Sequence, residues 1–223
     1  MSHLTDSYRQ FFIDLAPNNH SEWFNANRKR YENDVKIPFR NLVADLIPQL
    51  AKLDKNLIGV NPSDCIFRIN RDIRFSKDKT PYKLNMSAAI APGGRKNTAY
   101  PGFYFEATPE GINIYAGVYT AEKAQIDAIR HLIATNLKPF ETLITNSNFI
   151  NKFGGHILGE KQIRLSPELK TAAEKQPLIY NKQFYYKAEM DESFIIKENL
   201  IEILCDYFKA ALPVNAFLSK AME

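Results

Sequence analysis

Apolar residues at helical spacing mark both ends of the chain. Near the amino end they recur every three or four positions, the period that gives a helix one buried face. Pro38 and Pro48 should each kink or restart the helix that this spacing indicates. The same spacing returns near the carboxyl end, in SFIIKENLIEILCDYFKAAL. The pattern therefore predicts helical regions over residues 5–53 and 191–221.

The middle of the chain changes to the two-residue alternation of half-buried strands. Apolar and polar residues alternate from Leu84 to Ile90, and again in GFYFEAT and GINIYAGVY. Residues 109–111, Pro-Glu-Gly, separate the last two stretches and are typical of a hairpin turn. These features predict an antiparallel meander over residues 66–119, followed by a mixed helical and strand region over 120–190.

The order of these elements indicates an α+β fold, in which helical regions precede and follow an antiparallel sheet. A chain of 223 residues is most simply one domain, and we find no repeat or linker that would divide it. With 45% hydrophobic residues, such a domain can bury a core without a disulfide or a metal ion. We therefore expect a single domain of residues 1–223.

Several absences indicate a protein of the cytoplasm. Residues 1–19 lack the basic start and apolar run of a secretory signal, and no stretch approaches the ~18 apolar residues of a membrane span. Cys65 and Cys205 lie far apart, which fits free thiols in a reducing compartment. The histidines lack metal-site spacing, and no nucleotide-binding or nucleophile-elbow motif is present. We therefore expect a cytoplasmic protein that uses no metal and no cofactor and binds no membrane.

The net charge is concentrated in residues 67–83, FRINRDIRFSKDKTPYK. This stretch holds six of the 29 lysines and arginines and two of the 25 acidic residues. The rest of the chain is therefore balanced, and the whole formal surplus of +4 lies in these positions. A local positive field of this kind attracts phosphates, carboxylates or nucleic acid.

Interpreted as a strand, the stretch has one charged face and one apolar face. Asp72 would lie between Arg68 and Arg74 on the charged face, and a bulge would re-aim Arg71. A turn near Pro81 would then bring the chain back beside the arginines. The apolar face would hold Phe67, Ile69, Ile73 and Phe75.

This stretch closely resembles the hallmark of a large family of uncharacterised proteins, a domain of unknown function that is common in bacteria and has fungal relatives. The resemblance covers most of the chain and includes LAPNNHSEWFNANRKRYE and YPGFYFEA. The chain departs from the family pattern at His20-Ser21, where a basic residue is expected before Glu22. The resemblance implies no established activity. The signature residues that it implies are Arg68, Arg71, Asp72, Arg74, Phe75, Asp78, Lys79 and Tyr82.

The hallmark favours a pocket for a small anionic molecule that bears a phosphate or carboxylate, because arginine forks bind both groups through paired hydrogen bonds. Asp72 could act as a base, and Tyr82 or Lys79 as an acid or electrostatic stabiliser. The loop at Gly93-Gly94 could add backbone N–H groups, although a plain solvated loop is the commoner case. The residues expected to bind the ligand are Arg68, Arg71, Arg74, Lys83, Arg95, Trp23 and Tyr104.

Two other interpretations stay open. The basic residues could contact nucleic acid, with YNKQFYYK for base stacking, although a net charge of +4 argues against a wide basic surface. Alternatively, Arg–Asp pairs only tie the stretch to its neighbours, and the protein is an interaction module. In that case Trp23 and the tyrosines are core residues. The sequence leaves the oligomeric state and any catalysed reaction open.

Overall fold

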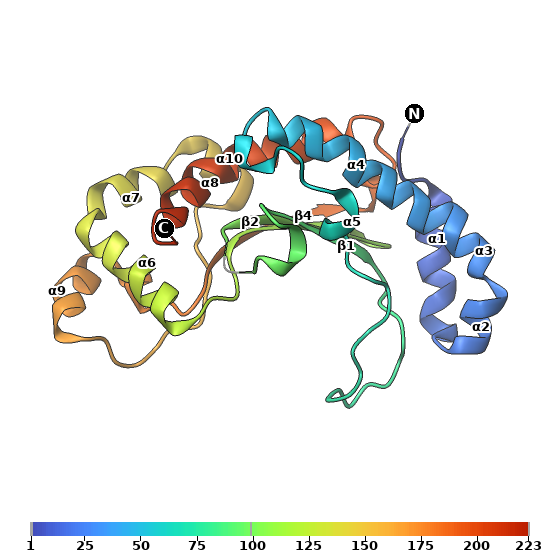
Figure 1. Cartoon of the computed structure of the whole chain (residues 1–223), viewed down its shortest axis with the longest axis horizontal. Coiled ribbons are helices and arrows are strands. Elements are labelled where there is room, and N and C mark those ends of the chain that lie inside the picture. Colours follow the sequence, from blue (N-terminus) through green and yellow to red (C-terminus); the bar gives the residue numbers. More distant parts are fainter. Residues whose placement is uncertain (1, 99, 223) are drawn as a thin grey trace. The chain divides into compact units, whose positions relative to one another are not determined.

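The structure is a computed structural model that describes residues 2–98 and 100–222. An antiparallel sheet from the middle of the chain, with helices before and after it in sequence, confirms the predicted α+β fold (Figure 1). The sheet has four strands in the order β1-β2-β3-β4. Their bounds are β1 Met86–Ile90, β2 Gly102–Thr108, β3 Gly111–Val118 and β4 Phe184–Asp191. The predicted hairpin is confirmed, because Pro109 and Glu110 connect β2 to β3.

The chain divides into two compact units, each built from several segments of the sequence. The first unit comprises Met1–Arg95, Tyr104–Ile114 and Glu189–Cys205. The second comprises Lys96–Phe103, Tyr115–Ala188 and Asp206–Glu223. A single domain of residues 1–223 stays a prediction.

The first half of the chain supplies most helices of the first unit, as predicted for residues 5–53. Pro38 lies in the first turn of α4, but the backbone is already right-handed helical at Lys36 and Ile37, so the helical path runs through this point without the expected restart. Pro48 lies inside α4, and the helix continues past it to Ala51. The bounds of the α-helices are α1 Asp6–Leu15, α2 Ser21–Ala26, α3 Arg28–Arg30, α4 Ile37–Ala51 and α5 Pro62–Cys65. The other short helices are η1 Ala16–Asn18, η2 Tyr31–Lys36 (a π-helical turn), η3 Lys55–Leu57, η4 Gly94–Lys96 and η6 Glu192–Phe194.

The core of the first unit lies between these helices and one face of the sheet. The buried side chains of α1 are Tyr8, Phe11, Phe12 and Leu15. On β2, Phe105 packs against Phe39 of α4, with ring centroids 5.5 Å apart. Because side chains alternate along a strand, Tyr104 and Glu106 lie on the opposite face of the sheet, where both are half-buried.

The region predicted as mixed over residues 120–190 forms most of the second unit. Its helices are α6 Lys123–Thr135, α7 Leu137–Ile144, α8 Ser147–Phe153, α9 Pro167–Lys175 and η5 Pro177–Tyr180, and the chain ends with α10 Leu200–Ser219. The hydroxyl of Tyr186 on β4 donates to Asn215 Oδ1 at 2.6 Å, and the ring of Tyr186 packs edge-on against Phe149 and Phe153. Tyr186 therefore ties β4 to two helices of this unit.

The structure corrects the strand predicted for the charged stretch. Regular pairing begins at Met86, and residues 67–85 form no strand. Phe75, expected on an apolar face, is 93% exposed, whereas Ile69 is buried. A strand needs a neighbour for its hydrogen bonds along its whole length, and this segment has only isolated bridges, such as Asn70 with Tyr82. The bulge expected at Arg71 is therefore not formed, because residues 67–85 are not a strand.

Two features bear on the expected cell compartment. Cys65 and Cys205 are both buried and neither forms a disulfide, as predicted. Within the described part of the chain, none of the helices has the length and apolar character that crossing a bilayer requires. The cytoplasmic location stays a prediction.

Candidate functional site

Residues 67–85 form an extended arm, which we call the basic arm. Figure 1 shows it leaving the sheet as two lengths of chain that run side by side to a tip. Near its base the backbone N–H of Arg71 donates to Pro81 O, and that of Lys83 donates to Ile69 O, both at 2.9 Å. These bonds fix the two lengths against each other.

Tyr82 anchors the arm to the connection between α1 and α2. Its backbone oxygen accepts from Asn19 Nδ2 at 2.9 Å, and its N–H donates to Asn19 Oδ1 at 3.1 Å. Its ring stacks on Phe24, with centroids 4.0 Å apart, and only 8% of Tyr82 is exposed. The two sequence motifs that contain Asn19 and Tyr82 therefore meet in the fold. The acid role predicted for Tyr82 stays a prediction.

The tip of the arm is held together by charged side chains of its own. Asp72 accepts two hydrogen bonds from Arg74, from Nε at 2.9 Å and from Nη2 at 2.7 Å. Arg71 donates to Asp78 and to Thr80, and Lys79 Nζ donates to Ile73 O at 2.9 Å. Asp72 therefore contacts Arg74 directly, outside the strand in which it was expected to lie between Arg68 and Arg74, and Arg68 lies close enough to attract Asp72 electrostatically. The tip thus uses most of its charge internally.

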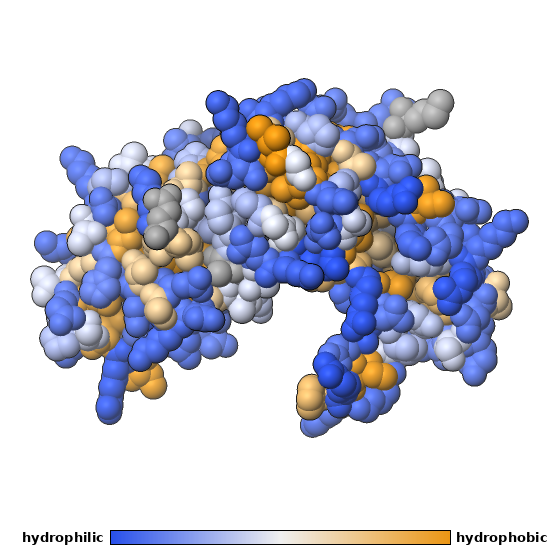
Figure 2. Space-filling view, in the orientation of Figure 1, coloured by the Kyte–Doolittle hydropathy of each residue, from blue (hydrophilic) through white to orange (hydrophobic). Residues whose placement is uncertain are grey.

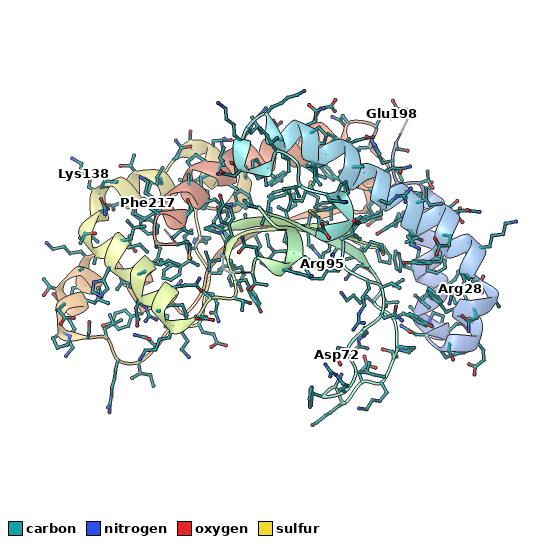
Figure 3. All side chains as sticks on the ribbon, in the orientation of Figure 1. Arg28, Asp72, Arg95, Lys138, Glu198 and Phe217 are labelled. Atoms are coloured by element: carbon teal, nitrogen blue, oxygen red, sulfur yellow. The ribbon has the colours of Figure 1, made fainter. Side chains whose placement is uncertain are left out.

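Hydrogen bonds hold both tip carboxyl groups in their ionised form. The bonds from Arg74 lower the pKa of Asp72 below its ordinary value. The backbone N–H of Thr80, followed by Arg71, lowers the pKa of Asp78 to about 2. The Asp72–Arg74 pair is nevertheless open to solvent, with 47% of the Asp72 side chain and 76% of the Arg74 side chain exposed, whereas only 26% of the Arg71 side chain is exposed. Figure 3 shows Asp72 near the far end of the arm.

Arg95 and Trp23, which the sequence predicted to bind the ligand, contact other parts of the first unit. Arg95 Nη1 donates to Ser63 O and Asp64 O, at 2.8 and 2.9 Å, and so closes the carboxyl end of α5. Gly94 lies against the same helix, because a Cβ there would come within 2.6 Å of Asp64 O. Trp23 packs against Phe11 at a centroid distance of 5.7 Å. Their ligand-binding roles stay predictions.

Two of the predicted residues, Lys83 and Tyr104, both contact Phe67 where the arm meets the sheet, and Arg68 acts on Lys83 electrostatically. Lys83 Nζ lies 5.2 Å from the centroid of the Phe67 ring, and Phe67 meets Tyr104 edge-on at 6.0 Å. Arg68 is exposed and close enough to Lys83 to repel its positive charge. The same strand alternation that buries Phe105 presents Tyr104 to the arm.

Glu106 completes this group and was not predicted from the sequence. Its carboxylate accepts from the Tyr104 hydroxyl at 2.9 Å, from Asn113 Nδ2 at 3.1 Å and from Asn85 Nδ2 at 3.4 Å. The alternation in GFYFEAT and the hairpin turn already put Tyr104, Glu106 and Asn113 on one face, and this signal could have found them. We call the group the sheet-face cluster; it consists of Arg68, Lys83, Asn85, Tyr104, Glu106 and Asn113.

Burial and charge act in opposite directions on Lys83. Partial burial lowers the pKa of its ammonium group, the negative charge of Glu106 raises that pKa, and the positive charge of Arg68 lowers it again. Neither Lys83 nor Arg68 forms an ion pair with any carboxylate of residues 2–98 and 100–222. Lys83 and Arg68 are therefore influenced by nearby carboxylates, those of Glu106 and Asp72, without a direct ion pair to either.

Comparison with curated proteins gives no match to this sequence. The family model of a conserved hypothetical protein, DUF2461, matches residues 7–217, which is nearly the whole chain. This match confirms the resemblance that the charged stretch suggested, and it attaches no activity to the site. The chain belongs to the DUF2461 family of conserved hypothetical proteins.

Proposed function

We propose that the sheet-face cluster binds a small molecule bearing a phosphate or carboxylate, and that Arg68 and Lys83 are its anion-binding residues. The observation that carries the proposal is a half-buried lysine with a nearby arginine, neither of which forms an ion pair with a carboxylate of the described residues. Like charges brought together at partial burial are unfavourable, and such arrangements gather at functional sites. A bound anion would remove the repulsion.

The surroundings suit a small ligand. A guanidinium group offers paired N–H donors to phosphate or carboxylate oxygens, and an ammonium group adds a point charge. The rings of Phe67 and Tyr104 supply apolar surface directly beside Lys83. The residues predicted to be catalytic each contact a different partner in the arm or its anchor: Asp72 contacts Arg74, Tyr82 contacts Phe24, and Lys79 contacts Ile73. We therefore propose binding only, and catalysis by these residues stays a prediction.

The charged pairs of the tip favour a structural role for part of the hallmark. Arg71 and Arg74 are each engaged by an aspartate of the arm. An anion would have to compete with these carboxylates for the arginines of the tip. Arg68 and Lys83 could bind an anion without first losing an ion pair. We therefore place the anion site at the base of the arm and give the ion pairs of the tip a structural role.

Thermal unfolding with and without phosphate tests the proposal. An anion that binds only the folded state stabilises it by mass action, so phosphate should raise the melting temperature more than chloride at matched ionic strength. The effect should be lost in Lys83→Met and weakened in Arg68→Gln. Lys29→Met and Arg40→Gln are matched controls, because both residues are exposed on helices of the first unit. A phosphate effect equal in Lys83→Met and wild type would overturn the proposal.

A further inference from the structure

We propose that the ligand of the sheet-face cluster carries an amino group as well as its anionic group, and that Glu106 recognises the amino group. This inference rests on the anion site proposed above and extends it to the class of ligand. The class is a short molecule with an anion at one end and an ammonium at the other, such as an aminoalkyl phosphate or an amino acid.

The first observation is how Glu106 is held. Its three hydrogen-bond donors, Tyr104, Asn85 and Asn113, are all neutral, so they orient the carboxylate without adding a positive charge to it. A carboxylate accepts about four hydrogen bonds, so three donors leave room for one more. No lysine or arginine among residues 2–98 and 100–222 forms an ion pair with Glu106. The carboxylate is therefore rigidly placed and still able to bind a cation.

The second observation is that the cluster keeps its opposite charges apart. Lys83 and Glu106 are close enough to influence each other, yet Lys83 Nζ lies over the Phe67 ring and makes no ion pair with the carboxylate. Contacts run from Lys83 to Phe67, then to Tyr104, and from its hydroxyl to Glu106. Aromatic surface thus lies along the path between the cation and the carboxylate. A ligand with two opposite charges joined by a short hydrocarbon chain matches this order of surfaces.

The third observation is an unsatisfied acceptor beside Glu106. Asn85 Oδ1 is buried and has no hydrogen-bond partner among the described residues. A buried acceptor without a donor is unfavourable, and proteins rarely keep one without a reason. Because this oxygen is closed to solvent, a donor brought by a bound molecule would satisfy it once the Asn85 side chain turns toward the ligand. An ammonium group has three donors, enough for Glu106 and for a further contact.

Titration calorimetry with matched pairs of probes tests the inference. The first pair is O-phosphoethanolamine and ethyl phosphate, and the second is 4-aminobutanoate and butanoate. In each pair the anion is the same and only the amino group differs. A charge-assisted hydrogen bond to Glu106 should make the amino probe of the pair that fits bind about tenfold more tightly to wild type. Comparison of the pairs also tells phosphate from carboxylate.

Variants of two glutamates separate recognition from general charge. Glu106→Gln should abolish the preference for the amino probe, while the probe without an amino group should bind at least as tightly as it does to wild type, because a negative charge near the anion site is removed. Glu110→Gln is the matched control, because Glu110 is exposed in the β2–β3 turn, and it should keep the full preference. Melting curves of both variants identify any loss of folding, and Glu106→Asp offers a charged replacement should Glu106→Gln fail to fold.

The outcomes separate failure of this inference from failure of the anion site on which it rests. Binding of ethyl phosphate or butanoate without any gain from the amino group overturns the inference and leaves the anion site standing. An amino preference that survives in Glu106→Gln also overturns the inference, because another group must then recognise the ammonium. Absence of binding by all four probes overturns both the anion site and the inference.

Discussion

Lys83 is the residue on which the proposed anion site depends most. The arm brings it back to the sheet beside Arg68, and partial burial over Phe67 lowers the pKa of its ammonium group. Glu106 counteracts that change only from a distance. Lys83 is therefore a cation whose charge the protein maintains at some electrostatic cost, and a ligand anion would offset that cost.

This placement gives anion binding a defined pH dependence. Binding needs the ammonium form, and the pKa of Lys83 is lowered from 10.5. Phosphate stabilisation should thus be complete at neutral pH and should decline as the pH rises through a value below 10.5. Above pH ~9 inorganic phosphate is almost entirely the dianion, so a decline in that range reports the lysine. The measurement is the phosphate-induced change in melting temperature across this range.

Lys83→Arg is the control for the pH prediction, because an arginine keeps its charge throughout the range. The variant should bind phosphate with little change over the same pH values. A decline of equal size in wild type and Lys83→Arg would assign the titration to another group. A wild-type effect that stays constant to the ordinary pKa of lysine would contradict the lowered pKa.

At the scale of elements, the basic arm has a base and a tip that are stabilised in different ways. The base is fixed by backbone hydrogen bonds and by Tyr82, which is stacked on Phe24 and bonded to Asn19. The tip relies on exposed ion pairs between side chains of the arm, such as Asp72 with Arg74. Exposed pairs add little to global stability, whereas buried aromatic contacts add much.

Two substitutions in the arm should therefore have very different effects. Tyr82→Ala removes a ring that is only 8% exposed, and it should lower the free energy of unfolding by about 3 kcal/mol. Asp72→Asn should leave that free energy close to the wild-type value, because both members of its pair are largely in solvent. Denaturant titrations followed by circular dichroism provide both values. A larger loss for Asp72→Asn than for Tyr82→Ala would show that the tip pairs carry the stability of the arm.

The arm also shows which features the sequence predicts and which it does not. The hairpin of β2 and β3 follows from alternation and a turn signal, both of which are local, and it was predicted correctly. In residues 67–75 the same alternation is misleading, because the chain leaves the sheet and Phe75 remains in solvent. Glu106 was not predicted, because local alternation does not show which distant residues a side chain will meet. Its importance depends on Asn85 and Lys83, which only the tertiary fold brings to it.

At the scale of the whole molecule, the surplus of positive charge is small and local. Figure 2 shows the arm as mostly hydrophilic, with apolar atoms near its end. Phe75 of the arm is 93% exposed. An exposed ring beside Arg74 and Lys77 is a feature that nucleic-acid-binding proteins use for stacking. The two arginines of the tip are already paired with aspartates, however, which reduces the charge available to phosphates.

We therefore expect no sub-micromolar binding of generic DNA or RNA at physiological salt. If all four surplus charges of residues 67–83 met phosphates, the logarithm of the binding constant would fall with the logarithm of salt concentration with a slope of about −3.6 for duplex DNA. Fluorescence anisotropy of labelled duplex DNA and single-stranded RNA over a range of salt concentrations measures this slope directly. Tight binding at physiological salt with a slope near that value, lost in Phe75→Ser or Lys77→Gln, would make the arm a nucleic-acid contact. Binding seen only at low salt and unchanged in Phe75→Ser would be nonspecific attraction to the arm's charge, and the small-anion site would remain the better-supported function.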